Sequence, residues 1–159
     1  MNINNRKKIR VLVMDIDGTL TDGKIYMGNS GELMKAFNAK DGCGIKDILP
    51  QYNIVPMIVT GRVSAIAEQR CKELGIKYLY QGVKDKLTFL DKLLKDMNLT
   101  FEEVAYIGDD ILDLECMQKS GVSACPKDAV KKILENADYV AEKKGGEGAV
   151  REFIDWLVV

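Results

Sequence analysis

The feature that most constrains this chain is an unbroken apolar run that ends in acids, "VLVM" (11–14) followed by "DIDGT" (15–19). A continuous run of β-forming residues is typical of a strand that is buried on both faces of a parallel sheet. Asp15 and Asp17 then stand at the carboxyl end of that strand. Ligands of open α/β sheets bind at this edge. The run therefore predicts both a parallel sheet and the location of a site.

The rest of the chain alternates between predicted strands and helices. Further strands are expected at 54–60, 77–81, 104–108, 122–125 and 138–141. Helices are expected at 41–49, 63–74, 87–97, 111–119, 128–136 and 149–157, and a hairpin is expected within 24–37 around the turn "GNSG". This alternation has the spacing of βαβ units, and it predicts an α/β fold with a mostly parallel sheet.

Length and charge limit the classes to which this protein can belong. The 159 residues suit one domain, 1–159, with a proper core. The formal net charge is −1 and the basic residues are scattered, which argues against a nucleic-acid partner. The sequence contains no signal-peptide pattern and no candidate transmembrane segment, so we expect a cytoplasmic protein with no membrane partner.

The sequence contains no histidine. This excludes Ser-His and Cys-His nucleophilic catalysis and imidazole acid–base chemistry. The four cysteines, which show no close pairing, are expected to be reduced, half-buried structural residues (Cys43, Cys71, Cys116, Cys125). An enzyme of this composition must use carboxylates, lysines, hydroxyls and a metal ion.

A second predicted strand also ends in acids, Asp109 and Asp110 after "YIG". Either acidic pair alone could equally be a turn or a helix N-cap. Two pairs at one edge of a sheet repel each other unless a cation neutralises them, and an all-oxygen site suits Mg²⁺. A carboxylate can also attack phosphorus, and a second acid can protonate the leaving oxygen. The acids therefore favour phosphoryl transfer.

Phosphoryl transfer also needs groups that hold the phosphoryl oxygens. Thr60, followed by Gly61, ends the strand predicted at 54–60, and Lys86 begins the helix after the strand at 77–81. Taken alone, Lys86 would be an ordinary solvated helix lysine. Its position in this series makes it a candidate.

Four motifs, in this order and spacing, resemble those of the haloacid dehalogenase superfamily of phosphatases: "DIDGT" (15–19), "TGR" (60–62), the lysine of "GVKDK" (82–86) and "GDDILD" (108–113). The resemblance implies an enzyme, a phosphoric monoester hydrolase that works through an aspartyl-phosphate. It assigns the nucleophile to Asp15, the general acid/base to Asp17 and the phosphoryl-binding groups to Thr60 and Lys86. It implies a Mg²⁺ site made by Asp15, Asp109 and the Asp17 carbonyl, supported by Asp110. We expect Asp113 to cap or orient rather than to ligate.

The intervals between the motifs are too short for a cap domain. The expected architecture is therefore a capless, three-layer Rossmann-like fold with a small β-hairpin flap, about 24–38, after the first strand. Longer stretches, "DGKIYMGNSGELMKAFNAKDGCGIK" (22–46), "LGIKYLYQGVKDK" (74–86) and "GGEGAVRE" (145–152), resemble the 3-deoxy-D-manno-octulosonate 8-phosphate phosphatases. This implies a phosphorylated sugar acid as substrate, a role in lipopolysaccharide precursor synthesis, and a homotetramer built partly by the hairpin.

The same resemblance implies a set of substrate-binding residues, namely Asn38, Asp41, Gly42, Lys46, Gly61, Arg62 and Arg70. It also implies that the C-terminal tail, about 143–159, carries Arg151 into the site of a neighbouring subunit. Phe37 is expected to pack in the core rather than to contact substrate, and Tyr26 and Met27 could pack hairpin against hairpin or cover the parent sheet.

Two residues depart from the pattern of that family. Lys46 stands where arginine is usual, which keeps the charge but loses a bidentate fork. Glu147 stands where arginine is common, a feature of phosphatases that act on nine-carbon 2-keto-3-deoxy acid 9-phosphates, whereas Arg62 favours the eight-carbon substrate. The nine-carbon substrate and a non-catalytic module of the same fold remain alternatives, and a receiver domain fits "DIDGT" poorly.

Overall fold

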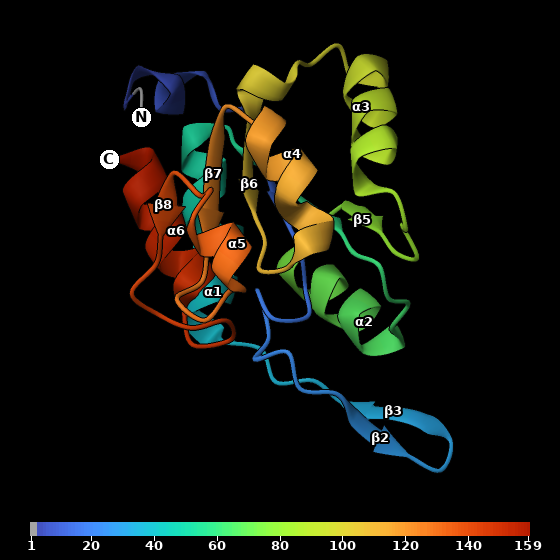
Figure 1. Ribbon diagram of the computed structural model, residues 1–159. Helices are drawn as coiled ribbons and strands as arrows, with labels where there is room; N and C mark the ends of the chain where they lie inside the picture. The colour runs from blue at the N-terminus through green and yellow to red at the C-terminus, as the bar shows by residue number, and fades with distance from the viewer. Residues whose placement is uncertain (1–2) are drawn as a thin grey trace.

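The main sheet of the protein, in a computed structural model that describes residues 3–159, has six strands in the order β5-β4-β1-β6-β7-β8 (Figure 1). These strands are β1 (Val11–Met14), β4 (Val55–Val59), β5 (Tyr78–Tyr80), β6 (Val104–Ile107), β7 (Val122–Cys125) and β8 (Tyr139–Val140). Every neighbouring pair is parallel. The predicted parallel sheet is confirmed.

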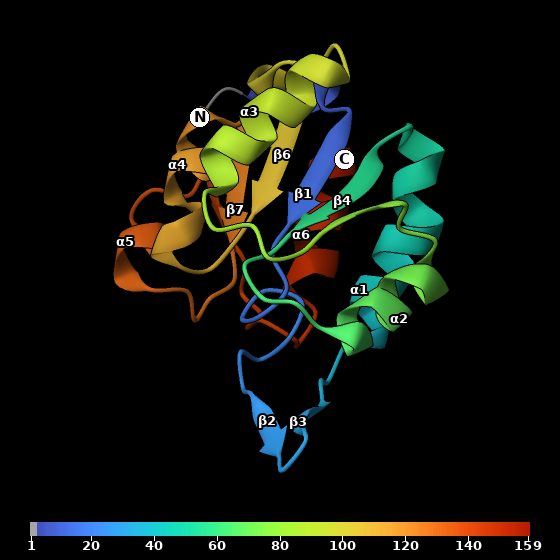
Figure 2. The ribbon, with the colours of Figure 1, turned by 90° about the vertical axis from the view of Figure 1, so that its right-hand side faces the viewer.

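Helices cover both faces of this sheet and make three layers (Figure 2). They are α1 (Ala39–Cys43), α2 (Ala65–Leu74), α3 (Lys86–Asp96), α4 (Leu114–Lys119), α5 (Lys131–Leu134) and α6 (Ala149–Val158). Shorter helical turns are η1 (Ile3–Lys8), η2 (Gly44–Ile48), η3 (Leu49–Tyr52), η4 (Phe101–Glu103) and η5 (Ile111–Asp113). None of the helices within residues 3–159 is long and apolar enough to cross a membrane.

Strand β1 supplies side chains to both cores because successive residues of a strand point to opposite faces. Leu12 and Met14 pack in the core shared with α2 and α6. Val11 and Val13 pack in the core shared with α3 and α4. All four residues of β1 are buried, as the continuous apolar run predicts.

The carboxyl end of β1 is a topological switch point. The chain passes from β1 to β4 and β5 on one side, and then crosses to β6, β7 and β8 on the other. Such a reversal leaves a crevice at the carboxyl ends of the central strands, where α/β proteins bind ligands. Asp15 follows β1 directly at this point.

The hairpin forms a separate two-stranded antiparallel sheet of β2 (Tyr26–Gly28) and β3 (Gly31–Met34). It projects from the body of the molecule, below the main sheet in Figures 1 and 2. We call residues 24–38 the arm. The turn signal "GNSG" located it correctly.

A few local expectations differ from the structure. Val63 begins the helix predicted at 63–74, but it precedes α2 and is 75% exposed, because Ser64 caps α2 and the helix starts only at Ala65. The helix predicted at 128–136 is reduced to α5, because the Val130 amide donates to the Asp109 carbonyl and holds the preceding residues in a turn. Cys43 is exposed, whereas the other three cysteines are buried; all four are free.

Candidate active site at the carboxyl end of β1

Asp15 lies at the centre of the site and is paired with Lys86. The Lys86 Nζ donates to Asp15 Oδ1 at 2.8 Å, and both residues are buried. Burial raises the pKa of Asp15 to about 6, and the Lys86 ammonium opposes this shift. Burial by itself would lower the pKa of Lys86, but the two adjacent carboxylates raise it. The lysine therefore carries its charge beside the Asp15 carboxylate.

Asp113 holds Lys86 in this position. It is 1% exposed, and its Oδ1 accepts hydrogen bonds from Lys86 Nζ at 2.7 Å and from the Tyr106 hydroxyl at 2.8 Å. Its Oδ2 accepts from the backbone amides of Asp109 and Asp110, at 3.1 and 3.3 Å. With both oxygens engaged, Asp113 orients Lys86 and the loop after β6.

Asp109 faces Asp15 across the carboxyl ends of β6 and β1. Thr19 Oγ1 donates to Asp109 Oδ1 at 2.8 Å. Burial, together with the nearby Asp15 and Asp113 carboxylates, raises the pKa of Asp109 to about 7. Gly18 has φ +96°, and a Cβ there would lie 2.1 Å from Asp109 Oδ2, so this loop approaches the carboxylate as only glycine permits.

These carboxylates fit a divalent cation. Asp15, Asp109 and Asp113 each offer an oxygen, and the three oxygens lie within 4.8 Å of one another. The Lys86 ammonium pairs with two of these acids, Asp15 and Asp113. We call these four residues the body cluster. Its excess negative charge and all-oxygen donor set are those that Mg²⁺ prefers.

Thr60 lies next to this cluster at the carboxyl end of β4, beside β1 in the sheet. It is buried, its amide donates to the Tyr80 carbonyl, and its own carbonyl accepts from the Val83 amide. These backbone bonds fix its position, and Gly61 follows in the exposed turn. The three strand ends therefore bring Thr60, Asp15 and Asp109 to one edge, as predicted.

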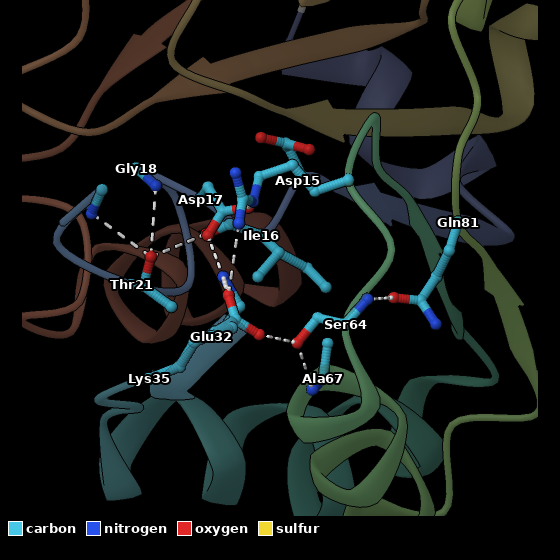
Figure 3. Close-up of polar contacts among 12 residues, drawn as sticks. Asp15, Ile16, Asp17, Gly18, Thr21, Glu32, Lys35, Ser64, Ala67 and Gln81 are labelled. Atoms are coloured by element: carbon cyan, nitrogen blue, oxygen red, sulfur yellow. Dashed lines mark hydrogen bonds and ion pairs between the residues drawn. The ribbon is translucent and has the colours of Figure 1, made fainter. Parts of the chain in front are cut away.

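The Asp17 side chain contacts residues of the arm, and Figure 3 shows it near Glu32 and Lys35. Lys35 Nζ makes a short ion pair with Asp17 Oδ1 and lies 3.0 Å from Glu32 Oε1. Arg62 Nε lies 3.5 Å from Asp17 Oδ2, and Arg62 Nη2 lies 3.6 Å from Glu32 Oε1. We call Asp17, Glu32, Lys35 and Arg62 the arm cluster. It pairs two carboxylates with two cations.

Glu32 also joins the arm to α2. The Ser64 hydroxyl donates to Glu32 Oε2 in a short hydrogen bond, and Ser64 Oγ accepts from the Ala67 amide as the N-cap of α2. Burial would raise the pKa of Glu32, but the Ser64 hydrogen bond and Lys35 together lower it. Sequence analysis did not find Glu32 or Lys35, since an acid and a lysine spaced i, i+3 on a hairpin have no motif.

Asp110 does not make the supporting contacts expected of it. Its side chain is exposed and accepts from the Ile111 amide at 2.7 Å as the N-cap of η5. The buried acid in the supporting position is Asp113, three residues later. A capping box joins the two acids, which explains why both occur in "GDDILD".

Four of the predicted substrate-binding residues lie together, but around a very small space. Asn38, Asp41, Gly42 and Arg70 line a cavity of about 10 Å³, which can hold at most one water molecule. Asp41 is buried and accepts from the Arg151 amide at 2.7 Å, so it anchors α6 to α1 rather than facing the site. Phe37 lines the same cavity and packs on the core, as expected.

Lys46 is not brought to the site. It lies on η2 and is exposed, and its Nζ donates to the Glu73 carbonyl near the carboxyl end of α2. Ser64 and Arg62 lie at the opposite end of this ten-residue helix, about 13 Å away at 1.5 Å per residue. Of the basic residues predicted to meet substrate, Arg62 is the one placed against a catalytic acid.

The glycine-rich segment before α6 packs on the loop of its own chain that follows Asp17. The Gly146 amide donates to the Thr19 carbonyl, and a Cβ at Gly145 would lie 1.9 Å from the Gly18 carbonyl oxygen. Arg151 lies on α6, where its Nε pairs with Asp155. Arg151 is half-buried, and its predicted reach into the site of a neighbouring subunit stays a prediction.

Comparison with known proteins agrees with this geometry. Residues 79–154 match the family model described as haloacid dehalogenase-like hydrolase. The 3-deoxy-D-manno-octulosonate 8-phosphate phosphatase of Salmonella typhi is 47% identical over 153 residues, which cover 96% of this chain and 81% of that protein.

Solved structures give the same result. The crystal structure of the phosphatase of that name from Yersinia pestis superposes with a TM-score of 0.93 at 46% identity, covering 98% of this chain and 84% of the other. The enzyme of that name from Moraxella catarrhalis, crystallised with a magnesium ion, a phosphate ion and a KDO molecule, has a TM-score of 0.93 at 38% identity, covering 98% and 89%.

Proposed function

Because the chain belongs to the haloacid dehalogenase-like hydrolases, among the 3-deoxy-D-manno-octulosonate 8-phosphate phosphatases, we propose that it hydrolyses this sugar-acid phosphate through Asp15. The proposal rests on one observation: four side chains lie together at one edge of the sheet, namely Asp15, Lys86, Asp109 and Thr60. This arrangement favours an active phosphatase over a non-catalytic module of the same fold, because such a module does not need all four of these residues.

The first step transfers the phosphoryl group to the enzyme. The Asp15 carboxylate attacks phosphorus while the bond from phosphorus to the sugar oxygen breaks. Asp17, entering the step as the carboxylic acid, gives its proton to the departing oxygen. Lys86 and the Thr60 hydroxyl donate to the phosphoryl oxygens. The products of this step are the free sugar acid and an aspartyl-phosphate.

The second step releases phosphate. Asp17, now a carboxylate, takes a proton from a water molecule whose oxygen attacks phosphorus, and the bond from phosphorus to the Asp15 oxygen breaks. Inorganic phosphate leaves, and Asp17 is again the acid. When bound, Mg²⁺ supplies positive charge beside the phosphoryl oxygens. Asp15 and Asp109, with the Asp17 carbonyl that the family pattern implies, would hold it, because both oxygens of Asp113 are already engaged.

Phosphate release with Mg²⁺ from the eight-carbon and nine-carbon keto-acid phosphates, measured side by side, tests this function. We expect kcat/KM to favour the eight-carbon ester by about tenfold or more, roughly 1.4 kcal/mol of transition-state binding. A preference for the nine-carbon ester would assign the protein to the phosphatases that act on nine-carbon keto-acid phosphates. If neither ester is preferred over a simple phosphate ester, the proposed substrate is rejected.

We also propose that residues 1–159 act as one cytoplasmic phosphatase domain that assembles as a homotetramer through the arm. The arm is a two-stranded sheet, which is marginally stable when it has no further packing. It exposes Met27, Leu33 and Met34, each more than half exposed. Clustered apolar side chains on a projecting hairpin suit contact with another copy of the chain.

Light scattering tests the assembly. The wild-type protein should have about four times the mass of one chain, and the double variant Met27→Lys, Leu33→Lys should shift toward smaller species, because each lysine would bury a charge in the contact. Lys24→Met, an exposed position on the same arm, is the matched control. A wild-type monomer at micromolar concentration would contradict the assembly without affecting the proposed chemistry.

A further inference from the structure

We propose that Lys35, held by Glu32, is a positioning residue for the general acid/base Asp17, so that the arm of the same chain completes the catalytic site. This inference rests on the proposed function, and it concerns two residues that none of the four sequence motifs contains. Figure 3 shows Lys35 reaching from the arm to Asp17, with Glu32 beside it.

The burial of Lys35 points to a specific role. Its side chain is 1% exposed, although its neighbours Met34 and Ala36 on the arm are exposed. A solvated surface lysine keeps its ammonium in water, whereas a buried ammonium must be paired with acids. Lys35 has two such partners, Asp17 and Glu32. An arm residue is therefore directed inward, against the acid that follows the nucleophile.

Glu32 fixes the lysine independently of Asp17. One Glu32 oxygen lies 3.0 Å from Lys35 Nζ, and the other accepts from the Ser64 hydroxyl. Ser64 is itself fixed, because it caps α2 and its amide donates to Gln81 Oε1 at 2.8 Å. A chain of contacts thus runs from the rigid start of α2 through Glu32 to Lys35. The Lys35 ammonium therefore has an ion-pair partner besides Asp17.

Arg62 cannot replace Lys35 in this arrangement. Its side chain is 45% exposed, and its Nε lies 3.5 Å from the second Asp17 oxygen. This exposed cation with longer contacts is free to turn toward a negatively charged substrate. Lys35 is the buried cation that sets the direction of the carboxyl group. A general acid works only when its proton is within hydrogen-bond reach of the leaving oxygen, so this direction matters for the rate.

The test uses two substrates that differ in their need for an acid. The sugar alkoxide is a poor leaving group and must be protonated, whereas 4-nitrophenolate leaves readily as an anion. Lys35→Met should lower kcat on the octulosonate ester by about tenfold to a hundredfold, part of the roughly 10²- to 10⁴-fold that a general acid contributes. On 4-nitrophenyl phosphate the loss should stay below about threefold, because that ester bypasses the acid. Glu32→Gln should act in the same direction with a smaller effect.

Two further variants separate positioning from a structural role. Lys35→Arg keeps the charge and should recover most of the rate, and Lys24→Met on the same arm, where the lysine is exposed, should leave both rates unchanged. Adding Lys35→Met to Asp17→Asn should cause no further loss, since Lys35 acts through Asp17. Thermal melts of all variants identify any that fail to fold, and Glu32→Gln then gives the leaving-group comparison in place of Lys35→Met.

Equal losses on the two esters, or a full additional loss in the Asp17→Asn background, would overturn the inference. The wild-type protein is assayed first with both esters. Turnover of 4-nitrophenyl phosphate without turnover of the octulosonate ester would reject the proposed substrate alone. The Lys35 comparison would then use the alkyl phosphate that the wild-type protein hydrolyses fastest, so the two failures remain distinguishable.

Discussion

Two lysine–aspartate pairs stand side by side at the end of β1, and they come from different parts of the molecule. Lys86, at the start of α3, pairs with Asp15, whereas Lys35, on the arm, pairs with Asp17. The body cluster sets three acids against one ammonium, while the arm cluster sets two acids against two cations. The body cluster is therefore short of positive charge and suits a metal ion, whereas the arm cluster is balanced without one.

The two clusters also differ in mechanical support. Asp113 reaches Lys86 from the turn that follows β6, and Tyr106 of β6 holds Asp113 from inside the packed core. Lys35 is held by Glu32 on a two-stranded sheet whose outer face is exposed. The proposed nucleophile, Asp15, is thus held by a residue that the core fixes, while the proposed acid/base, Asp17, is held by an appendage. Turnover of an ester that needs no acid should tolerate substitutions in the arm cluster, whereas substitutions in the body cluster should lower turnover of every ester.

The largest effect is expected at the nucleophile. Asp15→Asn removes the attacking carboxylate and should lower kcat by about 10⁴-fold or more on every phosphate ester, as for other nucleophile removals. The fold should survive, because an amide of equal size can still accept from Lys86. Phosphate release, with a thermal melt beside it, measures both. Substantial turnover in this variant would reject Asp15 as the nucleophile.

Lys86→Met should have the next largest effect. Losing one preorganised donor beside developing negative charge costs about 10²- to 10³-fold in kcat. Unlike Lys35→Met, this variant should lose rate equally on alkyl and aryl esters, because the phosphoryl group is common to both. Lys84→Met, exposed and two residues earlier, is the control. If Lys86→Met lost more kcat on the alkyl ester than on the aryl ester, the proposed difference in role between the body cluster and the arm cluster would be rejected.

The pH dependence of stability should have opposite signs in the two clusters. Asp15 and Asp109 have pKa values raised to about 6 and about 7, so the folded state without metal binds more protons than the unfolded state between about pH 4 and 7. Their contribution to the free energy of unfolding therefore falls as pH rises through this window. The lowered pKa of Glu32 contributes stability that is lost as pH falls toward that pKa.

Melts with and without Mg²⁺ at pH 5 and pH 8 measure this difference. Mg²⁺ should raise the melting temperature more at pH 8, where the body-cluster acids are ionised. At a hundredfold excess of Mg²⁺ over its Kd, the free energy of unfolding should rise by about 2.7 kcal/mol. Asp109→Asn should lose most of this gain, and Glu32→Gln should keep it. An equal gain in both variants would place the metal away from the body cluster.

The smallest effect is expected from Tyr106→Phe. It removes one buried hydrogen bond to Asp113 and should destabilise the protein by about 1 kcal/mol, measured by urea unfolding. The rate should fall only a few-fold on both esters, because Asp113 keeps its contacts with Lys86 and two backbone amides. A larger loss would show that Tyr106 matters for the position of Lys86 as well.

The sequence predicted the sheet because its signals are local. The apolar run before Asp15, the βα alternation and the turn "GNSG" each specify a short segment through periodicity and turn chemistry. One error fell at a helix cap and another where a distant contact decided the outcome. Val63 left its helix because Ser64 serves as the N-cap, and α5 was shortened because Val130 bonds to Asp109.

The sequence by itself determined the strand-end acids, Thr60 and Lys86, because parallel strands must bring their carboxyl ends to one edge. Only the tertiary structure decided that Asp113 rather than Asp110 contacts Lys86, that Lys46 points away from the site, and that Lys35, paired with Glu32, reaches Asp17. Those outcomes depend on the directions in which side chains leave a turn, a helix and a projecting hairpin. Such directions are set by packing between segments far apart in the chain, and no local pattern of residues encodes them.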